Sequence, residues 1–335
     1  MQNCIVIINK NAGSSKKISF EKVEQCLGRD YRYTRCTIPS DELPDFDGFD
    51  AVAVCGGDGT LSSILEKIYA KPVTVFYFPV GTLNDKAKVQ RYSHLKTNCP
   101  ANDKKDGAKP IVIGKCYPAP NAANGQEKAE GEKTDFEQKG KSTTEWQKTD
   151  GQSEREKDST VFSYVFAAGS FTPIGYTSDV KEKQRFGTLA YISKVVKEYR
   201  PHRIKAKIVC DDKEFEGEFS LIMFVKSPRC FGFPFNKDFD AESESGHLLA
   251  IRSPKRKGAL GYIEMFFPFF RAFFIGLKKE REDGTLIFKR VRQGKIELAQ
   301  SANFCKDGEK FTLNEGVHSI GFEHTRCDFC VIEKF

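Results

Sequence analysis

The sequence predicts two regions of different architecture, an α/β region followed by a region built mainly from β-strands. Apolar runs alternate with amphipathic stretches up to about residue 95, and strand patterns dominate after residue 160. A polar stretch with almost no aliphatic side chains, residues 118–160, lies between the two. Alternating strands and helices are typical of a parallel sheet with crossover helices, and a succession of short strands is typical of a sandwich.

Length, charge and cysteine content agree with two cytoplasmic domains. The chain has 335 residues, of which 39% are hydrophobic, enough for two cores. Its formal charge of +7 allows an anionic partner, although the positive charges are dispersed and no nucleic-acid-binding motif is present. Eleven cysteines without a signal peptide indicate reduced thiols, because an odd number cannot all pair.

The first domain, residues 1–95, is expected to contain four strands and two helices. One helix is expected over Ile18–Leu27, and a second begins at Leu61, where apolar residues recur at the spacing of one helix face. The strands are predicted from apolar runs at Cys4–Ile8, Tyr31–Thr37, Ala51–Cys55 and Val73–Phe78.

The second domain, residues 108–335, is predicted to be a β-sandwich interrupted by a disordered insertion. Residues 118–160 cannot bury enough apolar surface to offset an ordering cost of about 1–2 kcal/mol per residue. Helices are expected near Thr188–Glu198 and Leu260–Lys278. The expected strands are Pro110–Cys116, Val161–Ala168, Arg203–Cys210, Glu214–Val225, His247–Ser253, Gly284–Arg290, Lys295–Ala299, Lys310–Leu313 and Phe329–Ile332.

The helix expected over Leu260–Lys278 is rich in phenylalanine and is flanked by lysine and arginine. Glu264, Pro268 and Arg271 lie inside it and argue against a membrane-spanning helix. Two interpretations remain open, a core helix that covers the sandwich and an interfacial helix that contacts an anionic membrane. Both hold if one edge of the helix is exposed.

The most informative segment is Gly56-Gly57-Asp58-Gly59-Thr60, placed between an apolar strand and an amphipathic helix. Glycines in such a turn let backbone N–H groups approach phosphate oxygens, and a helix N-terminus favours negative charge. Asp58 would be repelled by a phosphate unless it takes a proton, binds a metal or orients a cation, which suggests chemistry. The competing interpretation is a glycine-rich turn in which Asp58 caps a helix.

Further motifs narrow the choice. Gly56–Thr60 resembles the loop shared by diacylglycerol kinases, sphingosine kinases, NAD kinases and phosphofructokinases. Phe78–Ala87, Asn9–Gly13, Phe186–Tyr191 and Asp307–Glu309 resemble, in the same order, four other motifs of the diacylglycerol kinase catalytic family. The closest resemblance is to the bacterial soluble diacylglycerol and lipid kinases, which implies a phosphofructokinase-like or NAD-kinase-like α/β nucleotide domain followed by a β-sandwich.

The resemblance implies an ATP-dependent lipid kinase that phosphorylates a lipid hydroxyl, most simply that of diacylglycerol, at a membrane surface. It implies ATP and Mg²⁺ as cofactors, a peripherally membrane-associated cytoplasmic enzyme and, since related enzymes are often dimers, a homodimer. Glu309 takes the position of the proton acceptor, and Asp58 that of the second essential carboxylate. The implied nucleotide-binding residues are Asn9, Gly13, Thr37, Gly56, Gly57, Gly59, Thr60, Gly81, Thr82 and Asn84.

Two departures from the family pattern concern metal binding. Val112 and Ser245 stand where the family usually has aspartate, and Ser245 corresponds to a metal ligand. Glu244 and Ser245 are therefore the expected metal-binding residues, with weaker oxygen ligands than usual. These departures leave open a catalytically silent homologue that binds lipid or nucleotide, and the shared Gly56–Thr60 loop leaves open an NAD kinase-type enzyme.

Overall fold

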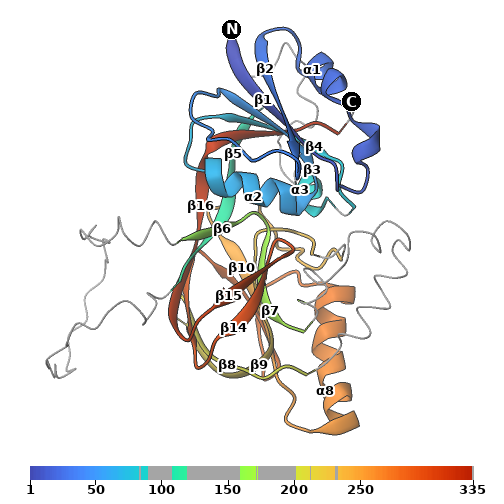
Figure 1. Cartoon of the computed structure of the whole chain (residues 1–335). Helices are drawn as coiled ribbons and strands as arrows, with labels where there is room; N and C mark the ends of the chain where they lie inside the picture. The colour runs from blue at the N-terminus through green and yellow to red at the C-terminus, as the bar shows by residue number, and fades with distance from the viewer. Residues whose placement is uncertain are drawn as a thin grey trace, which may run out of the picture.

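Figure 1 shows the computed structural model of the chain, which describes residues 1–82, 84–89, 108–118, 159–170, 172, 201–211, 213–230 and 233–333. An α/β part lies at one end of the molecule, and a β-rich part extends from it. Strands of both parts belong to one mixed sheet. The predicted insertion, the helix expected near Thr188–Glu198 and the expected boundary between residues 95 and 108 lie outside the described residues.

The α/β part contains the four predicted strands, β1 (Gln2–Asn9), β2 (Tyr31–Ile38), β3 (Ala51–Gly56) and β4 (Thr74–Pro79). They are parallel and follow the order β4-β3-β1-β2. Alternate residues of β1 face opposite sides of the sheet. Val6 packs in one core with helix α1 (Phe20–Leu27), and Ile7 packs in another with helix α2 (Asp58–Ile68). Both faces of the sheet are therefore buried, as expected for parallel strands.

The β-rich part is antiparallel. Its path runs through β8 (Ile204–Cys210), β9 (Lys213–Val225), β10 (Gly246–Arg252), β11 (Arg281–Glu282), β12 (Leu286–Val291) and β13 (Gln293–Leu298). Off this path lie β5 (Lys109–Tyr117), β6 (Thr160–Phe162), β7 (Val165–Gly169), β14 (Ala302–Lys306) and β15 (Glu309–Leu313). These strands enclose a phenylalanine-rich core that includes Phe166, whose ring stacks on Phe304 at 4.6 Å between centroids.

The longest strand, β16 (Gly316–Val331), connects the two parts. Its first half pairs with β13 and β5 in the β-rich part, whereas Asp328–Val331 pair in parallel with β4. The sequence predicts only Phe329–Ile332 of this strand and does not predict β14. Figure 1 accordingly places both chain ends beside the parallel sheet.

Two predicted elements differ in detail from the structure. The single strand expected over Val161–Ala168 is divided into β6 and β7, because backbone N–H groups between them bind a carboxylate instead of a neighbouring strand. The helix expected over Leu260–Lys278 begins earlier, as α8 (Gly258–Phe270), and ends in a π-helical turn, η4 (Arg271–Ile275).

Candidate active site

The candidate site lies at the carboxyl ends of the parallel strands. From β1 the chain moves to β2 on one side, and it then returns to β3 on the other side of β1. The loops after β1 and β3 therefore diverge, and such a reversal of strand order is where open α/β sheets bind ligands. The strand ends lie level in the register, since Ile8 pairs with Thr37 and Cys55, and Cys55 pairs with Phe78.

Three loops come together at this edge of the sheet, and they pack backbone against backbone. A Cβ atom on Gly81 would lie 2.4 Å from the Cα atom of Gly57, and one on Gly13 would lie 2.8 Å from Thr82 Oγ1. Both distances are shorter than real Cβ contacts, so only glycine allows these approaches. The loops that follow β1, β3 and β4 thus form one continuous surface.

Side chains also tie the loops to one another. Asn9 donates from Nδ2 to Thr60 Oγ1 at 2.7 Å. Thr60 also packs on Gly56, where a Cβ atom would lie 2.5 Å from the threonine Cβ. No side chain caps the N-terminus of α2 at Gly57. The backbone N–H groups at the start of this helix are therefore not used by a side-chain cap, and they suit an anionic ligand.

Thr37 and Asn84 lie at the same edge of the sheet with different roles. Thr37 is the penultimate residue of β2, and its backbone N–H donates to Asp41 Oδ2 at 2.6 Å. Asn84 has a positive φ of 50° and donates from Nδ2 to the Gly81 carbonyl oxygen at 2.9 Å. Asn84 therefore shapes the turn that presents Gly81 and Thr82.

Asp58 acts as a helix cap, but for a different helix from the one that it begins. Its carboxylate accepts hydrogen bonds from the backbone N–H groups of Asp85 (2.8 Å) and Lys86 (3.0 Å), at the start of the short helix α3 (Asp85–Val89). Burial and the nearby carboxylate of Asp85 raise the pKa of Asp58 to about 7, against the effect of the two N–H donors. The sequence could not predict this contact, because α3 lies 27 residues further along the chain.

Glu309 comes from the distant C-terminal part of the chain and reaches the same loop. It is the first residue of β15, its side chain is exposed, and its Oε1 accepts a hydrogen bond from Ser63 Oγ at 3.2 Å. The same oxygen would lie 4.0 Å from a Cβ atom on Gly59. The structure thus brings together the two segments from which the predicted catalytic carboxylates come.

Asp307 holds Glu309 in this position, a role that the sequence analysis missed. Its buried carboxylate accepts hydrogen bonds from Ser62 Oγ (2.7 Å) and from the backbone N–H groups of Ser163, Tyr164 (3.0 Å) and Val165 (2.9 Å). Asp307 therefore joins α2 to the segment between β6 and β7. The signal in the sequence is the Asp307–Glu309 motif, whose first residue provides the buried partner of Ser62.

The expected metal-binding residues do not come together as a metal site. The carboxylate of Glu244 pairs with Arg292 at 2.7 Å, and the hydroxyl of Ser245 shares a hydrogen bond with Ser243 Oγ at 2.8 Å. Val112 is buried in the β-rich core. Within the described parts of the chain, no three His, Cys, Asp or Glu side chains are grouped so that they could hold a metal ion. These residues therefore do not fit a structural Mg²⁺.

A cavity of about 440 Å³ lies beside α3, next to the glycine loops. Its lining includes Lys86, Val112, Lys226, Phe239 and Glu242. Lys86 is buried and donates to the Ser163 carbonyl oxygen at 2.7 Å, and burial lowers its pKa to about 8. The lining of the cavity therefore contains two buried lysines, Lys86 and Lys226.

Comparisons with known proteins relate this site to one family. Residues 3–109 match the family model of the diacylglycerol kinase catalytic domain. A solved diacylglycerol kinase from Bacillus anthracis is similar over 98% of this chain and 96% of its own, with a TM-score of 0.57 and 14% identity. Another B. anthracis structure assigned to this class, with 17% identity, gives a TM-score of 0.59 over 98% of this chain and 97% of its own. At these identities the likeness shows the fold. No curated protein matches the sequence.

Proposed function

We propose, from the match of residues 3–109 to the family model of the diacylglycerol kinase catalytic domain, that the protein transfers the γ-phosphate of ATP to a lipid hydroxyl, with diacylglycerol as the acceptor. The observation that supports this most directly is the meeting of three glycine-rich loops with the carboxylate of Glu309. Such a site pairs a phosphate cradle with a candidate base.

In this proposal, the nucleotide phosphates bind the backbone N–H groups at the start of α2. Gly57, Gly59 and Thr60 supply these donors, and Gly81 and Thr82 form the opposite wall. The substrate is the magnesium complex of ATP, in which the metal offsets charge on the transferred phosphoryl group. Because the loops pack backbone against backbone, the cradle exists before the nucleotide binds, which lowers the entropic cost of positioning it.

Glu309 is the proposed general base. A lipid hydroxyl is a poor nucleophile, so a carboxylate within hydrogen-bond distance would accept its proton as it attacks the γ-phosphorus. The bond from Ser63 Oγ restricts the Glu309 side chain and leaves its second oxygen, Oε2, for the substrate. Asp58 and Asp307 are proposed as positioning residues, because backbone N–H groups occupy their carboxylates.

The lipid would be approached through α8 and η4, which run along the outside of the β-rich part (Figure 1). One face of this helix, including Met265, Phe269 and Ala272, packs into the core. The opposite face exposes the large apolar side chains of Leu260, Tyr262, Ile263, Phe266, Phe267, Phe270, Phe274 and Ile275. The helix thus covers the core, as one interpretation expects, and its exposed apolar surface supports the proposal of an interfacial contact.

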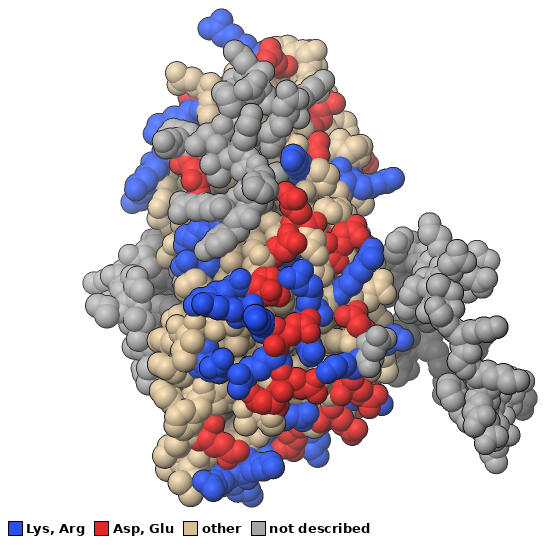
Figure 2. All heavy atoms as spheres, turned by 180° about the vertical axis from the view of Figure 1, so that it is seen from behind, with Lys and Arg blue, Asp and Glu red and all other residues tan. Residues whose placement is uncertain are grey.

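The charges around this helix suit a peripheral contact with anionic lipid. Lys255, Arg256 and Lys257 precede α8, and Lys278 and Lys279 follow η4. Gly258–Ile275 is long and apolar enough to cross a membrane, but its buried face belongs to a protein core. Elsewhere charges alternate, and Figure 2 shows Lys and Arg interspersed with Asp and Glu over the opposite view of the molecule. We therefore propose that the helix lies in the membrane interface.

The proposal is tested by transfer of labelled γ-phosphate from MgATP to lipids in mixed micelles. Diacylglycerol, monoacylglycerol, sphingosine and undecaprenol are offered separately, and NAD is offered in solution. Glu309→Gln is expected to lower kcat by about 100-fold or more while ATP affinity is retained, because only proton transfer is lost. Glu315→Gln, an exposed glutamate just after β15, is the matched control.

Each outcome identifies one function. A labelled lipid whose formation depends on Glu309 supports the lipid kinase and names its acceptor. Labelled NAD phosphate would instead indicate an NAD kinase-type enzyme. ATP binding without any product would indicate a silent homologue, and a Glu309→Gln variant as active as wild type would exclude Glu309 as the base.

A further inference from the structure

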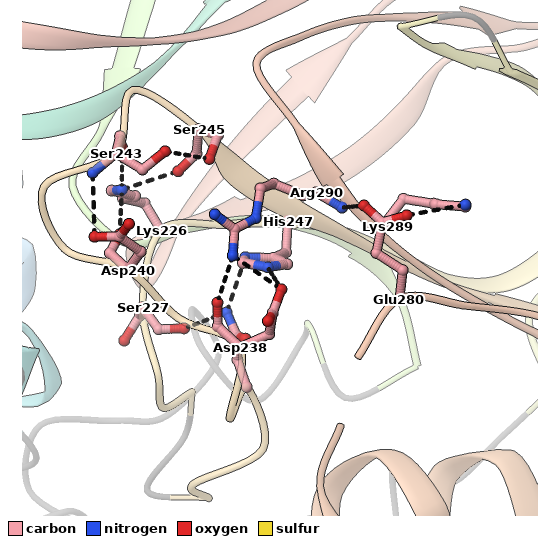
Figure 3. A network of polar contacts seen from close by, with 11 residues as sticks. Lys226, Ser227, Asp238, Asp240, Ser243, Ser245, His247, Glu280, Lys289 and Arg290 are labelled. Carbon is pink, nitrogen blue, oxygen red and sulfur yellow. Dashed lines mark hydrogen bonds and ion pairs between the residues drawn. The ribbon is translucent and has the colours of Figure 1, made fainter. Parts of the chain in front are cut away.

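A buried lysine stands at the centre of the loop that carries the expected metal ligands. Lys226 follows directly after β9, and only 2% of its surface is exposed. Its Nζ donates to three backbone carbonyl oxygens of one loop, those of Asp240 (2.7 Å), Ser243 (2.5 Å) and Ser245 (2.9 Å). Figure 3 shows the side chain pointing into this loop, between Asp240 and the two serines.

The number and type of these partners match an ammonium group. A protonated lysine has three N–H donors, so each donor has one carbonyl acceptor. The ring of Phe239 lies against the same group, with its centroid 5.5 Å from Nζ. Carbonyl oxygens and an aromatic face both stabilise positive charge, and together they surround it without a side-chain carboxylate bonded to Nζ.

Backbone carbonyls converging on one point are also typical of sites for hard divalent cations. We propose that the Lys226 ammonium is an internal cation of the loop Asp240–Ser245 and organises this loop in the way that a bound divalent metal otherwise would. The loop is therefore folded in the absence of metal. This inference concerns the folded state of the nucleotide-free protein and goes beyond the proposed reaction.

The surroundings of Lys226 disfavour an additional metal ion. Ser245 offers its carbonyl oxygen to Lys226 and its hydroxyl to Ser243, and Glu244 is neutralised by Arg292. The positive charge of Lys86 also acts on the position of Lys226. A divalent cation here would meet the positive charges of Lys226 and Arg292, and no three carboxylates of the described residues are grouped so that they could hold it.

The loop held by Lys226 contributes to the candidate site. Phe239, Ala241 and Glu242 line the cavity beside α3, together with Lys86. Asp58 positions the start of α3 from the glycine loop. Lys226 thereby acts as a positioning residue, because it holds one wall of this cavity without a bound metal.

The first test compares thermal unfolding of the nucleotide-free protein in EDTA and in millimolar Mg²⁺ or Mn²⁺. The wild-type Tm is expected to be the same in all three. Lys226→Met keeps the aliphatic stem but leaves three carbonyls without a donor, and it is expected to lower Tm by about 5 °C or more in each condition. The control Lys213→Met removes an equal charge from the exposed start of β9 and should leave Tm almost unchanged.

The second test exchanges the lysine for a metal site. Ser245→Asp combined with Lys226→Met is expected to bind Mn²⁺ in a calorimetric titration and to gain Tm from it. Ser245→Asp alone should not, because the ammonium still occupies the loop. This single variant keeps the inference testable if Lys226→Met fails to fold.

Three results would overturn the inference. They are a wild-type Tm that rises with Mg²⁺ or Mn²⁺, a Lys226→Met variant that melts like Lys213→Met, and Mn²⁺ binding by Ser245→Asp alone. None of these measurements depends on kinase activity, so a failure of the proposed reaction would leave their outcome unaffected.

Discussion

Asp58, Asp307 and Glu309 carry the same functional group close to one loop, yet their partners differ. Asp307 binds three backbone N–H groups and a serine hydroxyl. Asp58 binds two N–H groups, and Glu309 binds a single hydroxyl. A carboxylate whose oxygens already accept hydrogen bonds from backbone N–H groups is poorly placed to contact a substrate hydroxyl and accept its proton. At this scale, the exposed and least engaged of the three residues, Glu309, is the best candidate for the base.

The raised pKa of Asp58 predicts a specific pH dependence of stability. Asp58 keeps its proton up to pH about 7 in the folded protein but only to about 4 when unfolded. Unfolding therefore releases a proton between these values, and the free energy of unfolding contributed by Asp58 falls as pH rises through this window. The wild type should lose about 3 kcal/mol relative to Asp58→Asn between pH 4 and pH 7.

Chemical denaturation of both proteins across this range measures the difference directly. Outside the window, the two stability curves should run parallel, because the protonation state of Asp58 is then the same in the folded and unfolded chains. Curves that stay parallel from pH 4 to pH 7 would show that Asp58 is already ionised in the folded protein.

Among the structural elements, the glycine loops depend on close backbone contact. In Gly81→Ala, the added Cβ atom would lie only 2.4 Å from the Cα atom of Gly57. The two loops must therefore separate. A displacement of about 1 Å in a phosphate cradle is expected to weaken MgATP binding by tenfold or more, with a smaller effect on Tm. Equilibrium titration with a fluorescent ATP analogue measures this change.

Gly284→Ala is the control for the loop experiment, because a Cβ atom at Gly284 meets nothing within 4 Å. It should bind the nucleotide as the wild type does. Unchanged affinity in Gly81→Ala would show that the contact between these loops is not part of the nucleotide site.

The second element that permits a quantitative prediction is α8 with η4. Phe267 and Phe274 are 66% and 67% exposed, so their replacement should not destabilise the soluble protein. Each phenylalanine that enters a membrane contributes about 2 kcal/mol. Phe267→Ser combined with Phe274→Ser should therefore lower binding to anionic vesicles by at least about tenfold, as measured by co-sedimentation.

An exposed apolar residue on another element provides the comparison. Val317 on β16 is 51% exposed, and Val317→Ser should bind vesicles as the wild type does. Raising the salt concentration should weaken binding of all variants, since the basic residues that flank the helix attract anionic lipid. Equal vesicle binding by the double variant and the wild type would exclude this helix as the membrane contact.

For the whole molecule, β16 makes the stability of one part depend on the other. Phe329 lies where β16 pairs with β4 and is fully buried in one core with α2, whereas the first half of the strand pairs in the β-rich part. Phe329→Ala should lower the free energy of unfolding by about 3–5 kcal/mol. Because the strand is shared, we expect amide hydrogen exchange to become faster in both β3 and β8.

Val317→Ala, an exposed change at the other end of the same strand, should leave exchange in β3 and β8 unchanged. Faster exchange confined to β3 in Phe329→Ala would mean that the two parts unfold independently despite the shared strand.

The sequence by itself determined the features that depend on neighbouring residues. Apolar runs and helical spacing placed β1 to β4, α2 and most of the later strands, because these patterns reflect which face of a single element is buried. Short motifs identified the glycine loops and Glu309, since a phosphate cradle needs glycine at fixed positions. The amphipathic character of Gly258–Ile275 was also visible, as were both of its interpretations.

Only the tertiary structure decided which distant groups meet. Ser62 and Asp307 are 245 residues apart and share a hydrogen bond, and β16 enters the parallel sheet from the far end of the chain. The partners of Asp58 and Lys226 likewise follow from the three-dimensional packing. A local sequence pattern indicates that a residue is buried, but it does not identify the residue's partner. Whether a carboxylate acts as a helix cap or as a base, and whether a lysine acts as an internal cation, therefore depends on contacts that form only when the chain folds.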